Sequence, residues 1–431
     1  MTTNKRFLES GHLPTLIGAL LYFDVSFMVW VLLGPLAPFL REQFHLTPTQ
    51  QGLLVAVPLL GGSFFRPLLG MAGDRIGGRR TGLIGLLLTL MPLTLGWKVA
   101  QDVGHLYAIG LLLGVAGASF AVALPLASRW YPPEHQGLAM GIAGAGNSGS
   151  LLATLAAPRL AQRFGWEATF GLMLVPVVLV MIAFAILARD SPRHRTDQTW
   201  RDYAAVLREP DTLWFSCLYG LTFGGFVGFT SFLTTFFNDQ YQVSKVGAGD
   251  LTTIVIVAGS LLRPVGGWLS DRIGGYRLLL LLLLGVSCLL AAASTLPALP
   301  VVIALLFAAT GCLGMGNGAV FQLVPQRFVD RMGLVTGVVG AAGGLGGFFL
   351  PSMLGAVRDV AGTYAPGLVL LAFTFLAGAV GLLCLGSVWA ARWHAAAVKQ
   401  SGIFCYRGVV RGWRGSAVPS HSRSPRPSSP R

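Results

Sequence analysis

Twelve long apolar runs constrain the fold of this chain more than any other feature of its sequence. Each run is roughly 18 to 26 residues long, and about 20 apolar residues in a helix cross the ~30 Å hydrocarbon core of a bilayer. The expected spans are residues 15–39, 51–73, 81–98, 106–128, 138–158, 168–188, 212–236, 249–270, 278–296, 300–324, 334–355 and 366–391. We therefore predict an all-α membrane protein with twelve transmembrane helices.

The composition agrees with a membrane protein. Of the 431 residues, 54% are hydrophobic and only 11% are charged, which is unlike a soluble domain. The formal net charge of +14 does not require a nucleic-acid partner. If both termini are cytoplasmic, most lysines and arginines fall in cytoplasmic segments, as membrane topology demands. We expect a multi-pass protein of the cell inner membrane, surrounded by the lipid bilayer, monomeric and without nucleic acid.

A repeated segment indicates that the chain consists of two related halves. Residues 62–80 read GSFFRPLLGMAGDRIGGRR, and residues 259–277 read GSLLRPVGGWLSDRIGGYR. Two pseudo-symmetric six-helix bundles would account for this repeat. The expected domains are an N-terminal bundle (1–188), a cytoplasmic linker with a short surface helix (189–211), a C-terminal bundle (212–392) and a disordered basic tail (393–431).

Each copy of the repeat carries an arginine inside its apolar run, at Arg66 and at Arg263. At a rise of 1.5 Å per residue, each guanidinium would lie roughly 12 Å inside the membrane edge. An ionisable side chain at that depth is costly and is functional by default. Two such cations predict an anion between them.

The end of each copy resembles the G-x-x-x-D-R-x-G-R-R gating loop of the major facilitator superfamily. The charged residues of these loops are Asp74, Arg75, Arg79, Arg80, Asp271, Arg272 and Arg277. The resemblance implies that Asp74 and Asp271 pair with arginines across a helix end and hold an inward gate shut. The alternative is that these charges only set the topology.

Two glycine-rich segments also correspond between the halves. Residues 137–153 read GLAMGIAGAGNSGSLLA, and residues 333–349 read GLVTGVVGAAGGLGGFF. Glycine costs about 1 kcal/mol relative to alanine in a helix, so its density indicates close helix crossing or a backbone-lined path. Both segments resemble the paired signatures of the nitrate/nitrite porter family (the NarK/NasA group) of the major facilitator superfamily. The resemblance covers nearly the whole chain except the tail.

This resemblance implies transport of nitrate and/or nitrite by alternating access. Arg66 and Arg263 would clamp the anion, and Asn147 and Tyr219 would donate hydrogen bonds to it or to its neighbours. The aromatic walls would be Phe120 and Phe223, and the glycines that let helices slide would be Gly141, Gly144, Gly340, Gly343 and Gly344. Because Gly343 stands where the first signature has Asn147, only one half would offer an amide. A planar guanidinium matches two coplanar oxygens better than an ammonium does.

Two coupling schemes remain open. Two arginines without an anion would repel each other, which predicts nitrate/nitrite exchange. Asp24, a carboxylate in the first apolar run, could instead neutralise one arginine and take up a proton when the anion arrives. We favour proton symport, because a carboxylate in hydrocarbon is seldom kept without a use.

Other function classes are less consistent with the sequence. The membrane interior offers no His/Cys/Glu constellation for an enzyme, and the five scattered cysteines form no metal or disulfide pattern,. We therefore expect no enzymatic activity, metal or cofactor. The competing hypothesis is a major facilitator carrier for a small organic anion such as oxalate or formate, which would also use arginines.

Overall fold

The computed structural model describes residues 7–192, 199–328 and 332–400. The elements of the first half are α1 (Phe7–Ser10), α2 (Leu13–Trp30), α3 (Leu33–Phe44), α4 (Pro48–Ile76), α5 (Gly78–Lys98), α6 (Val103–Gly117), α7 (Phe120–Ser128), α8 (Pro133–Gly144), the 3-10 turn η1 (Ala145–Ser148), α9 (Gly149–Phe164) and α10 (Trp166–Leu187). The remaining elements are α11 (Trp200–Leu207), α12 (Pro210–Gln240), α13 (Lys245–Leu261), α14 (Arg263–Ile273), α15 (Gly275–Ala293), α16 (Leu299–Arg327), α17 (Met332–Ala361) and α18 (Ala365–Gln400).

Eleven stretches within the described residues are long and apolar enough to cross a membrane. They match eleven of the twelve predicted spans, and three of them are helix pairs with a break: α2–α3, α6–α7 and α13–α14. The predicted span 138–158 is the exception, because α8, η1 and α9 interrupt it with a 3-10 turn. Its high glycine content weakens a continuous helix, so this span has the expected position without the expected regularity.

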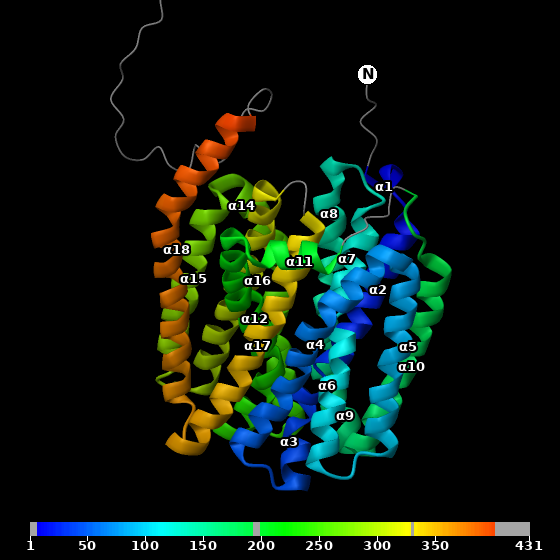
Figure 1. The fold of residues 1–431 in the computed structure, drawn as a ribbon. Coiled ribbons are helices and arrows are strands. Elements are labelled where there is room, and N and C mark those ends of the chain that lie inside the picture. Colours follow the sequence, from blue (N-terminus) through cyan, green and yellow to red (C-terminus); the bar gives the residue numbers. More distant parts are fainter. Residues whose placement is uncertain (1–6, 193–198, 329–331, 401–431) are drawn as a thin grey trace, which may run out of the picture.

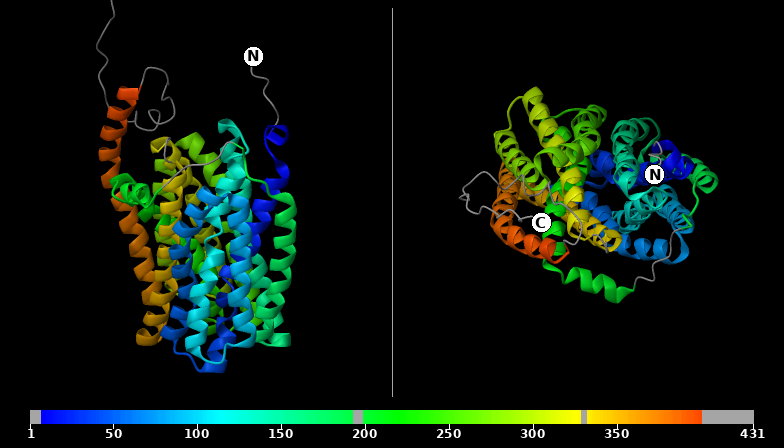
Figure 2. Two further views of the ribbon diagram at one scale, coloured as in Figure 1. Left: turned by 45° about the vertical axis from the view of Figure 1, so that its right-hand side comes forward. Right: turned by 90° about the horizontal axis from the view of Figure 1, so that it is seen from above.

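The helices form two bundles that stand side by side (Figures 1 and 2). Helices α2 to α10 make the first bundle and α12 to α18 the second, with α4 and α17 packed against each other between them. Helix α1 and the end of α18 lie at the same end of the molecule, called here the upper end as drawn in Figure 1. The other end, where α3 meets α4, is called the lower end.

The segments outside the bundles depart partly from the expected boundaries. Helix α11 occupies the predicted linker and provides its expected surface helix. Helix α18 continues to Gln400, so the expected disorder is wrong for residues 393–400, where the apolar helix is extended by alanines and other good helix formers. Residues 401–431 of the predicted tail lie outside the described residues.

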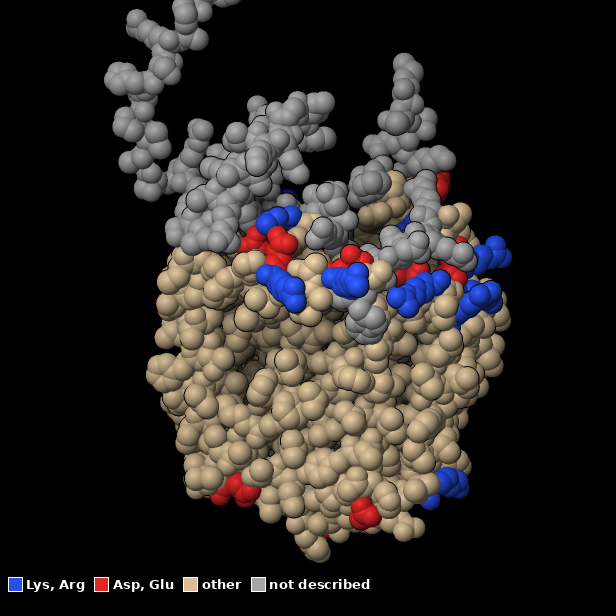
Figure 3. Space-filling model, viewed as in Figure 1, with Lys and Arg blue, Asp and Glu red and all other residues tan. Residues whose placement is uncertain are grey.

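Charged side chains are concentrated at the two ends of the molecule. Figure 3 shows Lys, Arg, Asp and Glu in a dense band at the upper end, fewer at the lower end, and a broad belt of other residues between them. Such a belt can face hydrocarbon without exposing charge. The distribution fits a bundle that crosses the membrane along the vertical direction of the figure.

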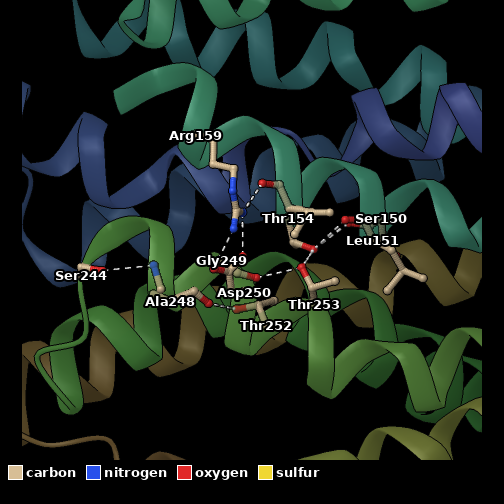
Figure 4. Close-up of polar contacts among 12 residues, drawn as sticks. Ser150, Leu151, Thr154, Arg159, Ser244, Ala248, Gly249, Asp250, Thr252 and Thr253 are labelled. Carbon is tan, nitrogen blue, oxygen red and sulfur yellow. Dashed lines mark hydrogen bonds and ion pairs between the residues drawn. The ribbon is translucent and has the colours of Figure 1, made fainter. Parts of the chain in front are cut away.

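Polar contacts tie the two halves together at the lower end. Arg159 of α9 forms a bidentate ion pair with Asp250 of α13, with N–O distances of 2.6 and 2.9 Å, next to a 2.7 Å hydrogen bond between Thr154 and Thr253 (Figure 4). Two further ion pairs there join the halves, Arg41 with Asp239 and Lys245 with Glu42. We call the three ion pairs the lower latch.

Close backbone contacts accompany the lower latch. A Cβ on Gly34 of α3 would overlap the backbone of Ser231 in α12, and one on Gly52 of α4 would overlap the carbonyl oxygen of Pro351 in α17. Small residues allow such approach where lipid provides no hydrophobic drive between helices. The lower end is therefore closed by both packing and charge.

Candidate functional site

Arg66 is the most deeply buried cation of the described structure. It stands on α4, is 1% exposed, and donates from Nε to the carbonyl oxygen of Gly117 at 3.1 Å. Its Nη1 donates to the carbonyl oxygen of Gly340, which belongs to the other half. Its Nη2 is buried and has no hydrogen-bond partner among the described residues. The guanidinium is thus held in place from both halves while one N–H group stays available.

Arg263 approaches the same place from the second half. Its guanidinium carbon lies 5.7 Å from the centre of the Phe120 ring, and that of Arg66 lies 5.5 Å from the same centre. Arg263 also lies over Phe321 at 5.6 Å, and its Nη1 is buried without a partner among the described residues. Aromatic faces attract cations, so the Phe120 ring contacts one guanidinium from each half inside the bundle.

Aromatic rings complete the walls of the site. Phe223 lies 5.2 Å from the Arg66 guanidinium carbon and stacks on Tyr219 with ring centres 5.0 Å apart. Phe120 and Phe223 are 6.5 Å apart. The two expected wall residues therefore adjoin each other and the same cation.

Two of the expected hydrogen-bonding residues are buried with unused polar atoms. Tyr219 and Asn147 are both fully buried. Within the described residues, neither amide atom of Asn147 has a hydrogen-bond partner. The hydroxyl of Tyr219 has none of ordinary hydrogen-bond geometry and interacts with the Arg263 guanidinium. Buried polar groups nearly always have partners, because leaving them unpaired is costly. Tyr219 stacks on Phe223 beside the cations, so its hydroxyl adds a neutral donor to the two guanidiniums, whereas the place of Asn147 in the site stays a prediction.

The second glycine signature packs directly against the site. A Cβ on Gly343 would lie 2.6 Å from the ring of Tyr219, and one on Gly340 would lie 3.2 Å from the ring of Phe120. A Cβ on Gly344 would lie 2.5 Å from Oγ of Ser63. These three glycines permit the contact of α17 with the rings and with α4.

In the first glycine signature, the close contacts with neighbouring helices fall at other glycines than the two named from the sequence. A Cβ on Gly144 would only touch the Arg263 guanidinium, at 3.7 Å, and one on Gly141 would have no atom within 4 Å. Gly141 therefore makes no close contact in this conformation, and its expected role in helix sliding stays a prediction. The tight contacts fall at Gly146 and Gly149, both against α2.

Asp24 lies beside the first signature and does not pair with an arginine of the site. Its Oδ1 accepts a 2.6 Å hydrogen bond from the hydroxyl of Ser148, the neighbour of Asn147. The ion pairs among the described residues include neither Arg66 nor Arg263 with this carboxylate. The expected pairing is thus absent from the described structure, since the side chain of Asp24 is directed at η1.

The loops with the gating motif form contacts within each half. Asp74 pairs with Arg129, which follows α7 in the same bundle, at 2.5 Å. Asp271 accepts a 3.1 Å hydrogen bond from the Gln322 amide, so its described partner is not the expected arginine. The second half has an arginine at the corresponding helix end, Arg327, but this arginine pairs with Asp211 and Glu209.

The remaining loop arginines lie at the upper surface. Arg79 donates from its backbone N–H to Asp190 at 2.9 Å and from its side chain to the carbonyl oxygen of Ala185 at 2.7 Å. Arg272 lies over the Trp268 ring at 3.9 Å. The other three, Arg75, Arg80 and Arg277, are exposed.

The sequence interpretation missed two aromatic residues of the site, Trp30 and Phe321. The fully buried indole of Trp30 donates to the carbonyl oxygen of Pro58 at 2.7 Å and lies 5.0 Å from the Arg66 guanidinium carbon. Phe321 contacts Tyr219 edge-on at 4.8 Å. Aromatic residues are common throughout apolar helices, so their types and positions gave no signal that separated these two from lipid-facing ones.

The chemistry of the site favours binding over conversion. Within the described residues, no group of three His, Cys, Asp or Glu is placed to hold a metal ion. The groups that converge are permanently charged guanidiniums and neutral donors. They can hold and release an anion.

Comparison with known proteins identifies relatives along most of the chain. A sequence model of the Major Facilitator Superfamily matches residues 18–351. The "Probable nitrate/nitrite transporter NarK2" of Mycobacterium tuberculosis is 38% identical, covering 85% of this chain and 94% of its own length. The "Nitrite extrusion protein" of Bacillus subtilis is 34% identical (82% and 90%), and the "Probable nitrate transporter NarT" of Staphylococcus carnosus is 33% identical (84% and 92%).

A solved structure supports the fold. A partially occluded inward-open conformation of the xylose transporter XylE from E. coli superimposes with a TM-score of 0.72 at 15% identity, covering 88% of this chain and 98% of that one. The structural similarity therefore covers the fold of both bundles.

Proposed function

Since this chain belongs to the nitrate/nitrite porters of the major facilitator superfamily, we propose that it carries nitrate and nitrite by alternating access, with Arg66 and Arg263 as the two sides of the anion site. The observation that carries this proposal is the convergence of both guanidiniums on the ring of Phe120. Each arginine comes from a different half, so an anion held between them is bound by both bundles.

The chemistry of the walls supports a small planar anion. Nitrate and nitrite are flat and delocalised, and a guanidinium fork can contact two coplanar oxygens. The free N–H groups of Arg66 and Arg263 and the hydroxyl of Tyr219 would serve as donors. Rings close the remaining sides, which favours small anions over larger polyanions. The second candidate, a carrier for oxalate or formate, uses the same cations, and competition separates the two.

The contacts of Asp24 move our proposal on coupling from symport to exchange. Its carboxylate accepts a hydrogen bond from Ser148, and it forms no described ion pair with Arg66 or Arg263. The empty site would then hold two uncompensated cations, whose repulsion disfavours the step in which the halves close around it. The change between the two access conformations would be faster with an anion bound than without one. A carrier with this property exchanges nitrate for nitrite.

The charge pattern supports a cytoplasmic upper end. Figure 3 shows Lys and Arg in the dense band at the upper end, as positively charged loops are found on the cytoplasmic side. The loop arginines lie where α4 meets α5 and where α14 meets α15: Arg75, Arg79, Arg80, Arg272 and Arg277. Both ends of the chain would then be cytoplasmic, in a monomer of the bacterial inner membrane. The lower latch would then close the external side, and access from the cytoplasm to the buried site would require the upper end to open.

Uptake of labelled nitrate into proteoliposomes tests this proposal. We expect uptake to be accelerated by nitrite inside the vesicles and inhibited by external nitrite and chlorate. Arg66→Lys and Arg263→Lys should each weaken nitrate binding about ten- to a hundredfold, because an ammonium cannot replace both N–H groups of a fork. Arg159→Lys, in the lower latch and outside the site, is the matched control.

Three results would count against parts of the proposal. Inhibition by oxalate alone would favour the organic-anion carrier. Full activity in both site variants would refute the guanidinium clamp. Uptake that needs an inward proton gradient and ignores the internal anion would restore symport.

A further inference from the structure

Asn317 of α16 is a buried amide that the function derived above does not use. Its exposed fraction is zero, and within the described residues neither its Oδ1 nor its Nδ2 has a hydrogen-bond partner. An amide in that condition destabilises the fold relative to an apolar side chain of similar size. Its presence therefore calls for a partner outside the described residues.

The position of Asn317 on its helix directs it toward the anion site. Phe321 follows it by one helical turn and shares its face. Phe321 touches Tyr219 at 4.8 Å and Phe120 at 5.9 Å between ring centres, and it lies under the Arg263 guanidinium. The face that carries Asn317 is thus the face that lines the site.

The two neighbours of Asn317 are glycines that bring other site helices close. A Cβ on Gly316 would lie 2.8 Å from Cγ2 of Thr222 on α12, and one on Gly318 would overlap the carbonyl oxygen of Arg263 on α14. Helix α16 is therefore pressed against α12 on one side and α14 on the other at this level. The amide is enclosed between the helices that carry Tyr219 and Arg263.

We propose that Asn317 is a substrate-contacting residue of the anion site and that its amide favours nitrate over nitrite. The inference rests on the proposed function, and it corrects the expectation that only one half offers an amide. The C-terminal half lacks an amide in its glycine signature, at Gly343, and supplies one from α16. Asn147 and Asn317 then place one amide donor in each half.

The number of hydrogen-bond donors in the site predicts which of the two anions, nitrate or nitrite, is preferred. The unpaired N–H groups of Arg66 and Arg263, the hydroxyl of Tyr219 and the amide of Asn147 already suffice for the two oxygens of nitrite. Nitrate offers a third oxygen where nitrite has only a nitrogen lone pair, so a further amide at that position gains more from nitrate. Losing one hydrogen bond to a charged ligand corresponds to about a ten- to hundredfold change in affinity.

The test compares Asn317→Ala and Asn317→Leu in the full chain, purified in detergent, with Thr310→Val as control. Thr310 lies on the same helix and donates a 2.6 Å hydrogen bond to the carbonyl oxygen of Val255, so its loss should lower stability without changing affinity. Dissociation constants for nitrate and nitrite are measured together with the melting temperature of the anion-free protein.

We expect both Asn317 variants to raise the nitrate dissociation constant about tenfold or more and the nitrite constant by less than about threefold. The anion-free melting temperature should stay equal or rise, because an unpaired amide has been removed. Unchanged nitrate affinity would overturn the inference, as would a lower melting temperature with equal losses for both anions, which would indicate a structural role. If the unmodified protein binds neither anion, the proposed function itself fails.

Discussion

An alanine at position 343 would have to share space with the ring of Tyr219. Its Cβ would lie 2.6 Å from two ring carbons of Tyr219 and 2.9 Å from one of Phe223, whereas carbon atoms in good contact are about 3.5–4.0 Å apart. Overpacking of this kind costs about 1–3 kcal/mol. Alanine regains about 1 kcal/mol in helix propensity. The fold should therefore lose only about 0–2 kcal/mol while Tyr219 moves away from α17.

The functional effect should exceed the effect on stability. Displacing Tyr219 removes its hydroxyl from the anion, which is worth about 1.5 kcal/mol or more for a charged partner and so at least about tenfold in affinity. Gly141→Ala is the matched control from the first signature, because its Cβ would have no atom within 4 Å. That variant should keep its affinity and gain stability.

Nitrate binding and thermal unfolding of both variants in detergent, followed by uptake in proteoliposomes, provide the assay. We expect a weaker dissociation constant for Gly343→Ala and a higher melting temperature for Gly141→Ala. Loss of uptake in Gly141→Ala together with normal binding in Gly343→Ala would refute the reasoning. It would mean that the signature glycines are required by contacts of another conformation.

Three further variants test other parts of the structure. The Arg159–Asp250 pair is 46% and 37% exposed, so it is worth about 0–1 kcal/mol. Asp250→Asn should therefore raise labelling of a cysteine introduced at the lower end of α12 by no more than about fivefold, and a larger rise would contradict this. Asp24→Asn keeps an acceptor for the hydroxyl of Ser148, so exchange should persist, and loss of pH-driven uptake would return Asp24 to the mechanism. Trp30→Phe removes the 2.7 Å hydrogen bond that the indole donates, which should lower the free energy of unfolding by about 1–3 kcal/mol. Thermal unfolding measures this loss, and an unchanged melting temperature would contradict it.

The sequence predicted the large-scale architecture because each of its signals is repeated. Arg66 and Arg263 occupy equivalent positions in two copies of one segment, and a cation inside an apolar run stands out from its surroundings. The superfamily match and the fold likeness confirm two bundles of membrane-crossing helices. The break at η1 was missed, because the length of an apolar run carries no information on local helix geometry.

The sequence also did not predict how each helix is rotated about its own axis. Asp24 faces η1 and Asn317 faces the site, yet each is one of a few polar residues in its apolar run. Uniformly apolar helices have little amphipathic pattern, so the sequence does not reveal which side of each helix points inward. Trp30 illustrates the same limit, since its role depends on the carbonyl group of a different helix.

The concentration of interbundle ion pairs at the lower end has a consequence for the medium in which the protein works. Lys245–Glu42 and Arg159–Asp250 lie at that surface with partly exposed side chains, and dissolved electrolyte screens exposed charges over about 8–10 Å at physiological ionic strength. A high salt concentration on that side would weaken the attraction within these ion pairs. The interactions of the buried guanidiniums would change little. Salt at the lower end, which we propose to face outside, would therefore alter how readily that end opens without altering which anion the protein selects.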